Sequence, residues 1–212
     1  MSEILIEGFN KTITMVFFST LFSVILGFIP AIALIVTAPK GLKPNKGVYN
    51  TLDTIINILR GFPFLILMVA IMPLTKLIVG KSIGTTAAIV PLTIAAAPFV
   101  ARIIESALKE VDPGVIEAAK SFGASNTQII FRVMLKEAVP SIISGLTLTI
   151  ISIIGYSAMA GTVGAGGLGD LAVRYGYQRY QTDVMIVTVI ILVIIVQVLQ
   201  SLGNYLYKKL SQ

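Results

Sequence analysis

Residues 138–169 read AVPSIISGLTLTIISIIGYSAMAGTVGAGGLG and contain no charged side chain. This run of 32 residues exceeds the roughly 20 apolar residues that a helix needs to cross the hydrocarbon core of a bilayer. Four further intervals also lack charge: 12–39, 61–75, 82–101 and 184–207. The pattern predicts an all-α polytopic membrane protein, a single domain over residues 1–212. Its five transmembrane helices are expected at 12–38, 54–76, 83–102, 138–162 and 184–207.

The second interval is the exception, because its 15 residues are too few to span a bilayer on their own. We therefore expect its helix to begin near Thr54. This start places Arg60 inside the predicted span, with its guanidinium reaching back to the lipid headgroups.

The composition supports the same class of protein. Hydrophobic residues make up 56% of the 212 residues and charged residues 12%, against about 25% charged in a soluble domain. The chain has neither cysteine nor histidine, which excludes disulfides, thiolate nucleophiles, Ser-His-Asp triads and HExxH zinc sites. We accordingly expect no catalytic, metal-binding or cofactor-binding residue in this chain.

The distribution of Lys and Arg predicts the orientation of the chain in the membrane. With the N-terminus outside, 11 of these residues lie in inside loops and 5 outside. The inside residues are Lys40, Lys43, Lys46, Arg60, Arg102, Lys109, Lys120, Arg132, Lys136, Lys208 and Lys209. The positive-inside rule then predicts N-out and C-in. The net charge of +6 therefore reflects membrane topology, and no nucleic-acid partner is expected.

Residues 102–137 differ from the rest of the chain, since they hold ten charged side chains, about the density of a soluble domain. We expect the loop 103–137, between the third and fourth spans, to project into the cytoplasm. Asp112 suits a helix N-cap, Pro113 the first helical position and Gly123 the left-handed residue that ends a helix.

Ser125 and Gln128 form a capping box that predicts the start of a second short helix. The first of the two helices carries an apolar stripe, because Val115, Ala119 and Phe122 are spaced i, i+4, i+7. Insertion of this stripe into a groove on another protein and its packing onto the chain's own membrane domain are equally compatible with the pattern.

The same loop resembles a known motif. Glu117-Ala118-Ala119, followed after three residues by Gly123 and later by Val133 and Leu135, is similar to the EAA loop of ABC importer permeases. The proline that ends the usual pattern is replaced here by Lys136, although Pro140 follows. Residues 155–181, GYSAMAGTVGAGGLGDLAVRYGYQRYQ, and residues 58–64, ILRGFPF, resemble the methionine-uptake permeases of that superfamily.

The resemblance implies the fold and partners of a type I ABC importer permease in the bacterial inner membrane. Such a permease forms a homodimer, receives substrate from an external binding protein, often a lipoprotein, and docks a cytoplasmic subunit that holds ATP and Mg. The implied coupling helix lies between spans three and four. Its implied contact residues are Val115, Ile116, Glu117, Ala118, Ala119, Phe122, Gly123 and Ala124. Ordinary solvation of Glu117 on a helix surface is the alternative for that residue.

The fourth span carries a stripe of small and polar residues on one helix face. Its members are Ser141, Gly145, Thr149, Ser152, Tyr156 and Met159. Such a stripe either packs helices closely or lines a hydrated path. Ser152, Tyr156 and Met159 are the candidates for a translocation path. Met159 is expected either to gate that path or simply to fill the core.

Spans one, three, four and five carry no charged residue in their interiors, so we expect that the path neither pairs with a substrate charge nor relays protons through carboxylates. Residues 164–169 match GxGxxG, but a predicted membrane span rather than a strand precedes them, which argues against a dinucleotide site. The leading function is import of methionine or a close amino acid without an ATPase motif in this chain. The alternatives are a permease for another small amino acid, an ion-coupled secondary carrier and a membrane-embedded enzyme.

Overall fold

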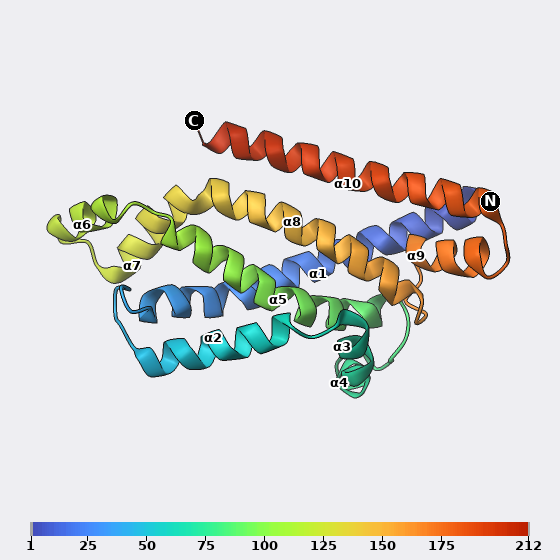
Figure 1. Ribbon diagram of the computed structural model, residues 1–212, viewed down its shortest axis with the longest axis horizontal. Helices are drawn as coiled ribbons and strands as arrows, with labels where there is room; N and C mark the ends of the chain where they lie inside the picture. Colours follow the sequence, from blue (N-terminus) through green and yellow to red (C-terminus); the bar gives the residue numbers. More distant parts are fainter. Residues whose placement is uncertain (1, 212) are drawn as a thin grey trace.

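The structure is a computed structural model that describes residues 2–211, and over that range it contains helices and no β-strand. Its four long helices are α1 (Ser2–Thr37), α5 (Thr85–Lys109), α8 (Leu135–Gly161) and α10 (Thr182–Leu210). They run along the longest axis of the molecule (Figure 1). Each is long and apolar enough to cross a membrane. The all-α prediction is confirmed.

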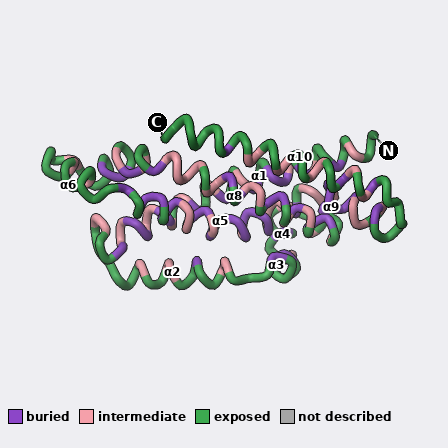
Figure 2. The backbone as a smooth tube through the Cα atoms, turned by 45° about the horizontal axis from the view of Figure 1, so that its top comes forward, coloured by how far each residue is buried: buried purple, intermediate pink, exposed green. Residues whose placement is uncertain are grey.

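Helix α5 lies at the centre of the bundle and packs against α1 and α8. Its Leu92, Val100 and Leu108 are fully buried, and Figure 2 shows burial concentrated along this helix. The contact with α1 is close, since a Cβ atom at Gly27 would lie 2.6 Å from the Ala97 carbonyl oxygen. In a bilayer, small residues of this kind let helix backbones approach and gain dispersion energy.

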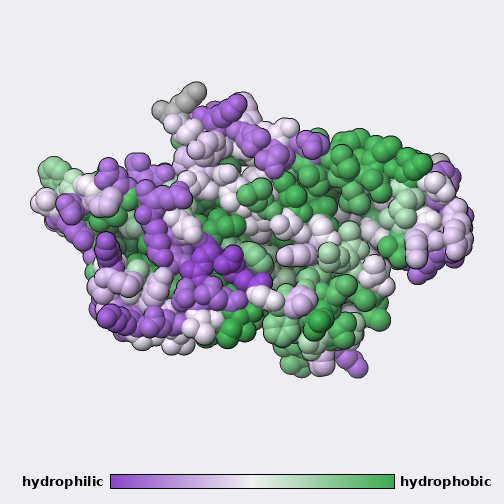
Figure 3. Space-filling model, viewed as in Figure 1, coloured by the Kyte–Doolittle hydropathy of each residue, from purple (hydrophilic) through white to green (hydrophobic). Residues whose placement is uncertain are grey.

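The outer surface of the bundle is apolar along most of its length. Large side chains such as Ile29, Ile66 and Leu77 are more than half exposed. Figure 3 shows hydrophobic residues over the middle of the molecule and hydrophilic residues gathered toward its two ends. This distribution is the inverse of a soluble domain and fits a protein whose sides contact lipid.

The second predicted span, 54–76, is not one helix, and this prediction is wrong. The structure has α2 (Lys46–Arg60), α3 (Phe64–Ala70) and α4 (Met72–Val79), with an angle of 101° between α2 and α3. Pro63 explains the break, because it has no N–H to donate and disfavours helical geometry at the residue before it. Pro63 has extended backbone angles, φ −61° and ψ 125°.

Three other boundaries differ from the sequence-based expectation. Helix α1 begins about ten residues before the predicted first span. Helix α5 continues to Lys109, so residues 103–109 belong to a helix rather than to the loop. Helix α8 is preceded without interruption by α7 (Asn126–Gln128) and a π-helical segment, η1 (Ile129–Met134).

The short helix α6 (Pro113–Ser121) marks one end of the molecule, here called the α6 end. The N-terminus lies at the opposite end, and α10 runs from there back toward the α6 end (Figure 1). Termini at opposite ends require an odd number of membrane crossings. The four long helices give four candidate spans, and the bent pair α2–α3 gives the fifth.

The end opposite α6 holds the glycine-rich turn after α8. Gly164 and Gly167 have positive φ angles of 87° and 90°, a region that glycine adopts at little cost. The turn leads into α9 (Leu168–Leu171), whose first N–H donates to Thr12 Oγ1 at 2.9 Å. Helix α8, not a strand, precedes the GxGxxG match.

A π-helical segment, η2 (Ala172–Tyr177), follows α9. Its Arg174 forms an ion pair with the buried carboxylate of Asp170, and Arg174 Nε donates to Asp170 Oδ1 at 3.1 Å. The hydrogen bonds to this carboxylate raise the pKa of the Arg174 guanidinium above its ordinary value. The pair fixes the segment that leads into α10.

Candidate functional site

Helix α6 projects from one end of the bundle (Figure 1), and its ends are set by the predicted signals. The side chain of Asp112 accepts a hydrogen bond from the Gly114 N–H at 2.7 Å and caps the helix. Gly123 has φ 76°, the left-handed conformation that ends a helix most easily when the residue is glycine. The capping box between Ser125 and Gln128 is present in both directions.

The apolar residues of α6 divide between two faces. Ile116 and Ala119 pack against the core at the α6 end. Val115 and Phe122 point away from it and are 40% and 92% exposed. The predicted single stripe is therefore wrong for Ala119, which faces inward. Packing onto the chain's own membrane domain, one of the two arrangements left open by the sequence, describes the inward face, and insertion of the outer face into another protein stays a prediction.

Glu117 and Ala118 are also exposed, whereas Ala124 is half-buried against the core. The Glu117 side chain makes no ion pair within residues 2–211. It lines a groove of about 620 Å³ that runs between α6, the loop after α1 and the end of α5. Lys40 and Lys120 line the same groove, so the surface around α6 combines exposed apolar side chains with a charged rim.

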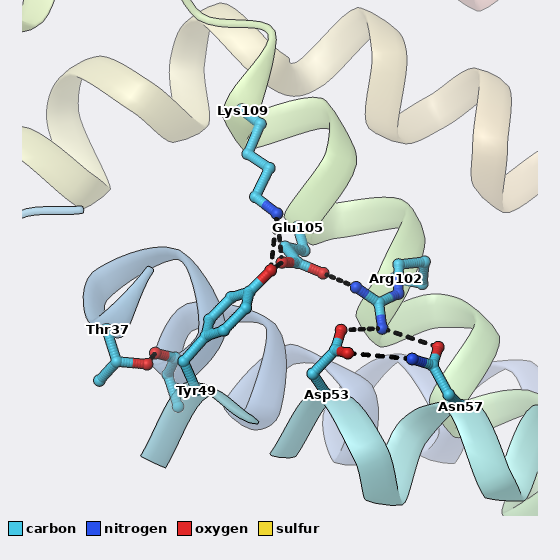
Figure 4. Close-up of polar contacts among 8 residues, drawn as sticks. Thr37, Tyr49, Asp53, Asn57, Arg102, Glu105 and Lys109 are labelled. Carbon is cyan, nitrogen blue, oxygen red and sulfur yellow. Dashed lines mark hydrogen bonds and ion pairs between the residues drawn. The ribbon is translucent and has the colours of Figure 1, made fainter. Parts of the chain in front are cut away.

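A buried polar network ties α2 to α5 close to this loop (Figure 4). The carboxylate of Glu105, 1% exposed, lies 2.6 Å from Arg102 Nη1 and 2.6 Å from Lys109 Nζ. Tyr49 of α2 donates to Glu105 Oε1 at 3.3 Å. Arg102 also reaches Asp53 of α2 at 2.7 Å. The network therefore holds α2 against the last two turns of α5.

Sequence analysis missed this network, because it assigned Glu105 and Lys109 to the loop 103–137 and Arg102 to the end of the third span. Their spacing of i, i+3 and i, i+4 was the available signal, since such residues share one helix face. The partners on α2 could not be found from spacing alone, because Tyr49 and Asp53 are about fifty residues away along the chain.

The polar stripe of α8 faces α5 over part of its length. A cavity of about 140 Å³, here called the mid-span cavity, lies between the two helices. Its lining residues are Ala96, Phe99, Ile103, Leu148, Thr149, Ser152, Ile153 and Tyr156. Tyr156 also stacks on Phe64 of α3, with ring centroids 4.8 Å apart. Of the three candidate path residues, the structure places Ser152 and Tyr156 on this cavity.

Met159 does not line the mid-span cavity. Its side chain is 45% exposed on α8, one turn beyond Tyr156 and toward the end opposite α6. Met159 is therefore not part of the core of a single copy, and its role as a gate stays a prediction. The exposed thioether lies on the same helical stripe as Ser152 and Tyr156.

A second cavity, here called the end cavity, continues the first toward the α6 end. Its volume is about 230 Å³, and it shares Phe99 and Ile103 with the mid-span cavity. Its other lining residues are Arg60, Arg102, Ser106, Ala107, Glu110, Ser141 and Gly145. Together the two cavities follow the α8 stripe from Ser141 to Tyr156. Within residues 2–211, no group of three or more His, Cys, Asp or Glu residues is arranged to hold a metal ion.

Comparison with known proteins identifies the family to which the chain belongs. Residues 23–212 match the family described as "binding-protein-dependent transport system inner membrane component". The chain belongs to this family of membrane permease subunits, which confirms the resemblance found in the α6 loop and in residues 155–181.

Particular relatives are close. The chain is 50% identical over 209 residues to the probable D-methionine transport system permease protein MetI of Vibrio cholerae, covering 99% of this chain and 93% of that one. It is 44% identical over 173 residues to the methionine import system permease protein MetP of Bacillus subtilis, covering 82% and 78%. A solved inward-facing structure of the MetNI methionine ABC transporter contains a chain with a TM-score of 0.98 and 43% identity, covering 100% and 98%.

The network at Glu105 predicts a stability effect. Substitution Glu105→Gln removes the buried carboxylate and leaves Arg102 only its pair with Asp53, so the free energy of unfolding should fall by about 2 kcal/mol, the contribution of hydrogen bonds to a charged group. The readout is the thermal midpoint of the purified protein in detergent. Glu117→Gln is the matched control, because Glu117 is exposed and unpaired in the described chain. Equal midpoints for the two variants would contradict the structural importance of the network.

Proposed function

We propose that the chain is the permease subunit of an ATP-driven importer that carries methionine or a closely related amino acid into the cytoplasm. The observation that carries the proposal is full-length similarity in sequence and fold to methionine permeases. The mid-span cavity and the end cavity together form a groove between α5 and α8. This groove supports the proposal, because small and polar side chains line an otherwise apolar bundle there.

The proposed orientation places the α6 end in the cytoplasm, with the N-terminus outside and the C-terminus inside. The excess of Lys and Arg at the α6 end supports this orientation. The chain acts as a homodimer in the bacterial inner membrane and is surrounded by lipid. An external binding protein delivers the substrate, and the groove between α5 and α8 faces the second copy.

The chain itself binds no cofactor in this proposal; ATP and Mg belong to a separate cytoplasmic subunit. That subunit docks on α6, the coupling helix, through Val115, Glu117, Ala118 and Phe122 on its outer side. Ile116, Ala119 and Ala124 anchor the helix to the bundle, and Gly123 allows the sharp turn out of it. Closure of the ATPase then moves α6 and, through its anchors, the ends of α5 and α8.

The function is tested by uptake of radiolabelled L-methionine into liposomes that contain the permease, its ATPase subunit and its binding protein. We expect accumulation with ATP and Mg, and none with ADP. Ionophores that collapse proton and sodium gradients should leave the rate unchanged. Uptake driven by an ion gradient without ATP would establish the secondary-carrier alternative instead, and preference for another small amino acid in competition would replace methionine as the substrate.

The role of α6 predicts the effect of a single truncation. Phe122→Ala removes the most exposed aromatic side chain of the helix, and interface aromatics of this kind commonly contribute 2 kcal/mol or more, roughly a thirtyfold change in affinity. The ATPase subunit should therefore dissociate from the permease during co-purification. Phe9→Ala, at the other end of the molecule, is the matched control and should retain the ATPase. Retention by both variants argues against docking through Phe122.

Met159 is proposed as a gate at the outer end of the path, where two copies of this exposed thioether meet across the homodimer axis. A flexible thioether can close a narrow passage between helices. Met159→Ala should therefore raise passive leak of methionine from loaded liposomes, or raise ATP hydrolysis that is not coupled to uptake. Val193→Ala, a half-exposed apolar residue of α10, serves as the control. An unchanged leak and an unchanged coupling ratio would remove the gating role.

A further inference from the structure

The groove beside α6, here called the α6 groove, is larger than either cavity between α5 and α8. Its volume is about 620 Å³, against about 230 Å³ for the end cavity and about 140 Å³ for the mid-span cavity. It lies between α6, the turn that follows α1 and the end of α5. The proposed transport path does not pass through it, so the α6 groove has no role in the function described so far.

The floor of the α6 groove is apolar and belongs to the core of the molecule. Ile35 of α1, Leu108 of α5 and Met134 of η1 line it, and each of these side chains is less than 10% exposed. Such a surface gains free energy when an apolar chain covers it and removes it from water. The floor therefore suits the hydrocarbon part of a ligand.

The rim of the α6 groove is positively charged. Lys40 and Lys120 line it, are exposed and take part in none of the five ion pairs found within residues 2–211. Lys109 lines it too, but its ammonium lies 2.6 Å from the Glu105 carboxylate. Glu117 is the one acidic residue in the lining. The rim therefore offers two unpaired lysines against a single carboxylate, which favours an anionic ligand.

The turn that carries Lys40 is held against the end of α1. Its Lys43 N–H donates to the Val36 carbonyl at 2.9 Å. At Gly41 the backbone passes so close to the Ile35 carbonyl that no Cβ atom would fit. The backbone that carries the Lys40 charge is thus ordered before any ligand binds, which lowers the entropy that binding has to cost.

The α6 groove lies at the expected surface of the bilayer. Ile35 belongs to the last turn of α1, within the first uncharged run, and Lys40 is the first charged residue after that run. In Figure 3 the hydrophobic surface of the middle gives way to hydrophilic surface toward the α6 end. With that end in the cytoplasm, as proposed, the lysines lie at the headgroups of the inner leaflet and the floor extends toward its acyl chains.

The α6 groove lies on the side of α6 opposite to Phe122. Pro113, Ile116 and Lys120 line the groove and are spaced i, i+3, i+7, so they share one helix face. Val115 and Phe122, also seven residues apart, point away from the bundle on the opposite face. A ligand in the groove and an ATPase subunit docked on Phe122 can therefore be bound at the same time.

We propose that the α6 groove binds an anionic phospholipid of the inner leaflet, such as phosphatidylglycerol. Its phosphate lies between Lys40 and Lys120, and one acyl chain covers the floor formed by Ile35, Leu108 and Met134. Basic pockets between membrane helices on the cytoplasmic side commonly bind anionic headgroups. A free phosphate would leave the apolar floor uncovered, and a zwitterionic lipid would bring its own ammonium to the two lysines.

The bound lipid has a consequence for coupling. It connects the turn after α1 to α6, so it braces the coupling helix from the side opposite to the ATPase. The proposal rests on the proposed function for this consequence and on the proposed orientation for the leaflet. It adds a lipid of defined charge to the partners that the importer needs.

The site is tested by photo-labelling the complex of permease and ATPase in nanodiscs of phosphatidylcholine. The probe is phosphatidylglycerol with a diazirine in one acyl chain, and labelled peptides are mapped by mass spectrometry. We expect labels in residues 34–42 and 108–120, displaced by unlabelled phosphatidylglycerol. The double variant Lys40→Gln/Lys120→Gln should bind the probe about twenty-five-fold more weakly, roughly fivefold for each lysine at the membrane surface.

The matched control is the double variant Lys208→Gln/Lys209→Gln. It removes two exposed lysines from the last turn of α10, which reaches the same end of the molecule. Probe binding by this control should equal that of the unmodified chain. A second probe with the same diazirine chain on phosphatidylcholine should label residues 34–42 and 108–120 weakly.

The brace is tested by transport. ATP-driven uptake of L-methionine should be faster in liposomes that contain phosphatidylglycerol than in pure phosphatidylcholine. This difference should disappear in Lys40→Gln/Lys120→Gln and persist in Lys208→Gln/Lys209→Gln. Persistence in both double variants overturns the role of the lipid in coupling.

Four labelling results bear on the site itself. Absence of labels from residues 34–42 and 108–120 overturns it, and so does equal probe binding by the two double variants. Equal labelling by the phosphatidylcholine probe overturns the selection of an anionic headgroup. Displacement by inorganic phosphate, but not by sodium chloride at the same ionic strength, assigns the rim to a free anion and overturns the lipid. A complex that binds the lipid but imports no methionine with ATP refutes the proposed function and leaves the lipid site intact.

Discussion

The hydrocarbon core of a bilayer offers no hydrogen-bond partner to a peptide group, and the rest of this structure follows from that constraint. Every backbone N–H and C=O at membrane depth has to be satisfied within its own helix, so the chain folds into helices that run the length of the molecule. Because lipid tails are as apolar as these side chains, burial of apolar side chains does not cause the helices to associate. They associate instead through van der Waals packing where their backbones approach closely. The contact of Gly27 with the Ala97 carbonyl is an example of this packing.

The same constraint concentrates the chemistry at the ends of the bundle. Ten of the 26 charged residues lie in 102–137. Part of that charge is internal, because the buried Glu105 is neutralised by Arg102 and Lys109 and holds α2 against α5. The rest surrounds α6, which is fastened by Ile116 and exposes Phe122. The α6 end therefore combines a network that holds α2 against α5 with an exposed surface on which we propose that the ATPase subunit docks.

How far the sequence predicts this arrangement depends on the range of the interaction. Local signals were sufficient for α6, since Asp112, Gly123 and the capping box at Ser125 act within a few residues. The long uncharged runs predicted the helical class for the same reason. The turn of 101° after α2 was missed even though Pro63 was visible, because hydropathy averages over the residue that breaks the helix.

Long-range contacts account for what the sequence could not provide. Asp53 and Tyr49 meet the α5 charges only after the chain has folded back on itself. Arg60 lies over the Phe99 ring because α2 ends beside α5. The polar stripe of α8 was visible from helical spacing, but the contact of Gly145 with Ile103 and the cavity beside Ser152 required the structure.

The central claim is that closure of the ATPase moves α6 and the ends of α5 and α8, and that this movement changes access to the mid-span cavity from the α6 end. The chain has no cysteine, so Ser152→Cys introduces a single thiol on the wall of the mid-span cavity. Its rate of modification by a membrane-impermeant maleimide, added on the ATPase side of reconstituted vesicles, measures access directly. The account predicts rapid modification without nucleotide and strong protection when the ATPase is trapped with ATP. Equal rates in the two states, in a complex that still hydrolyses ATP, would contradict it.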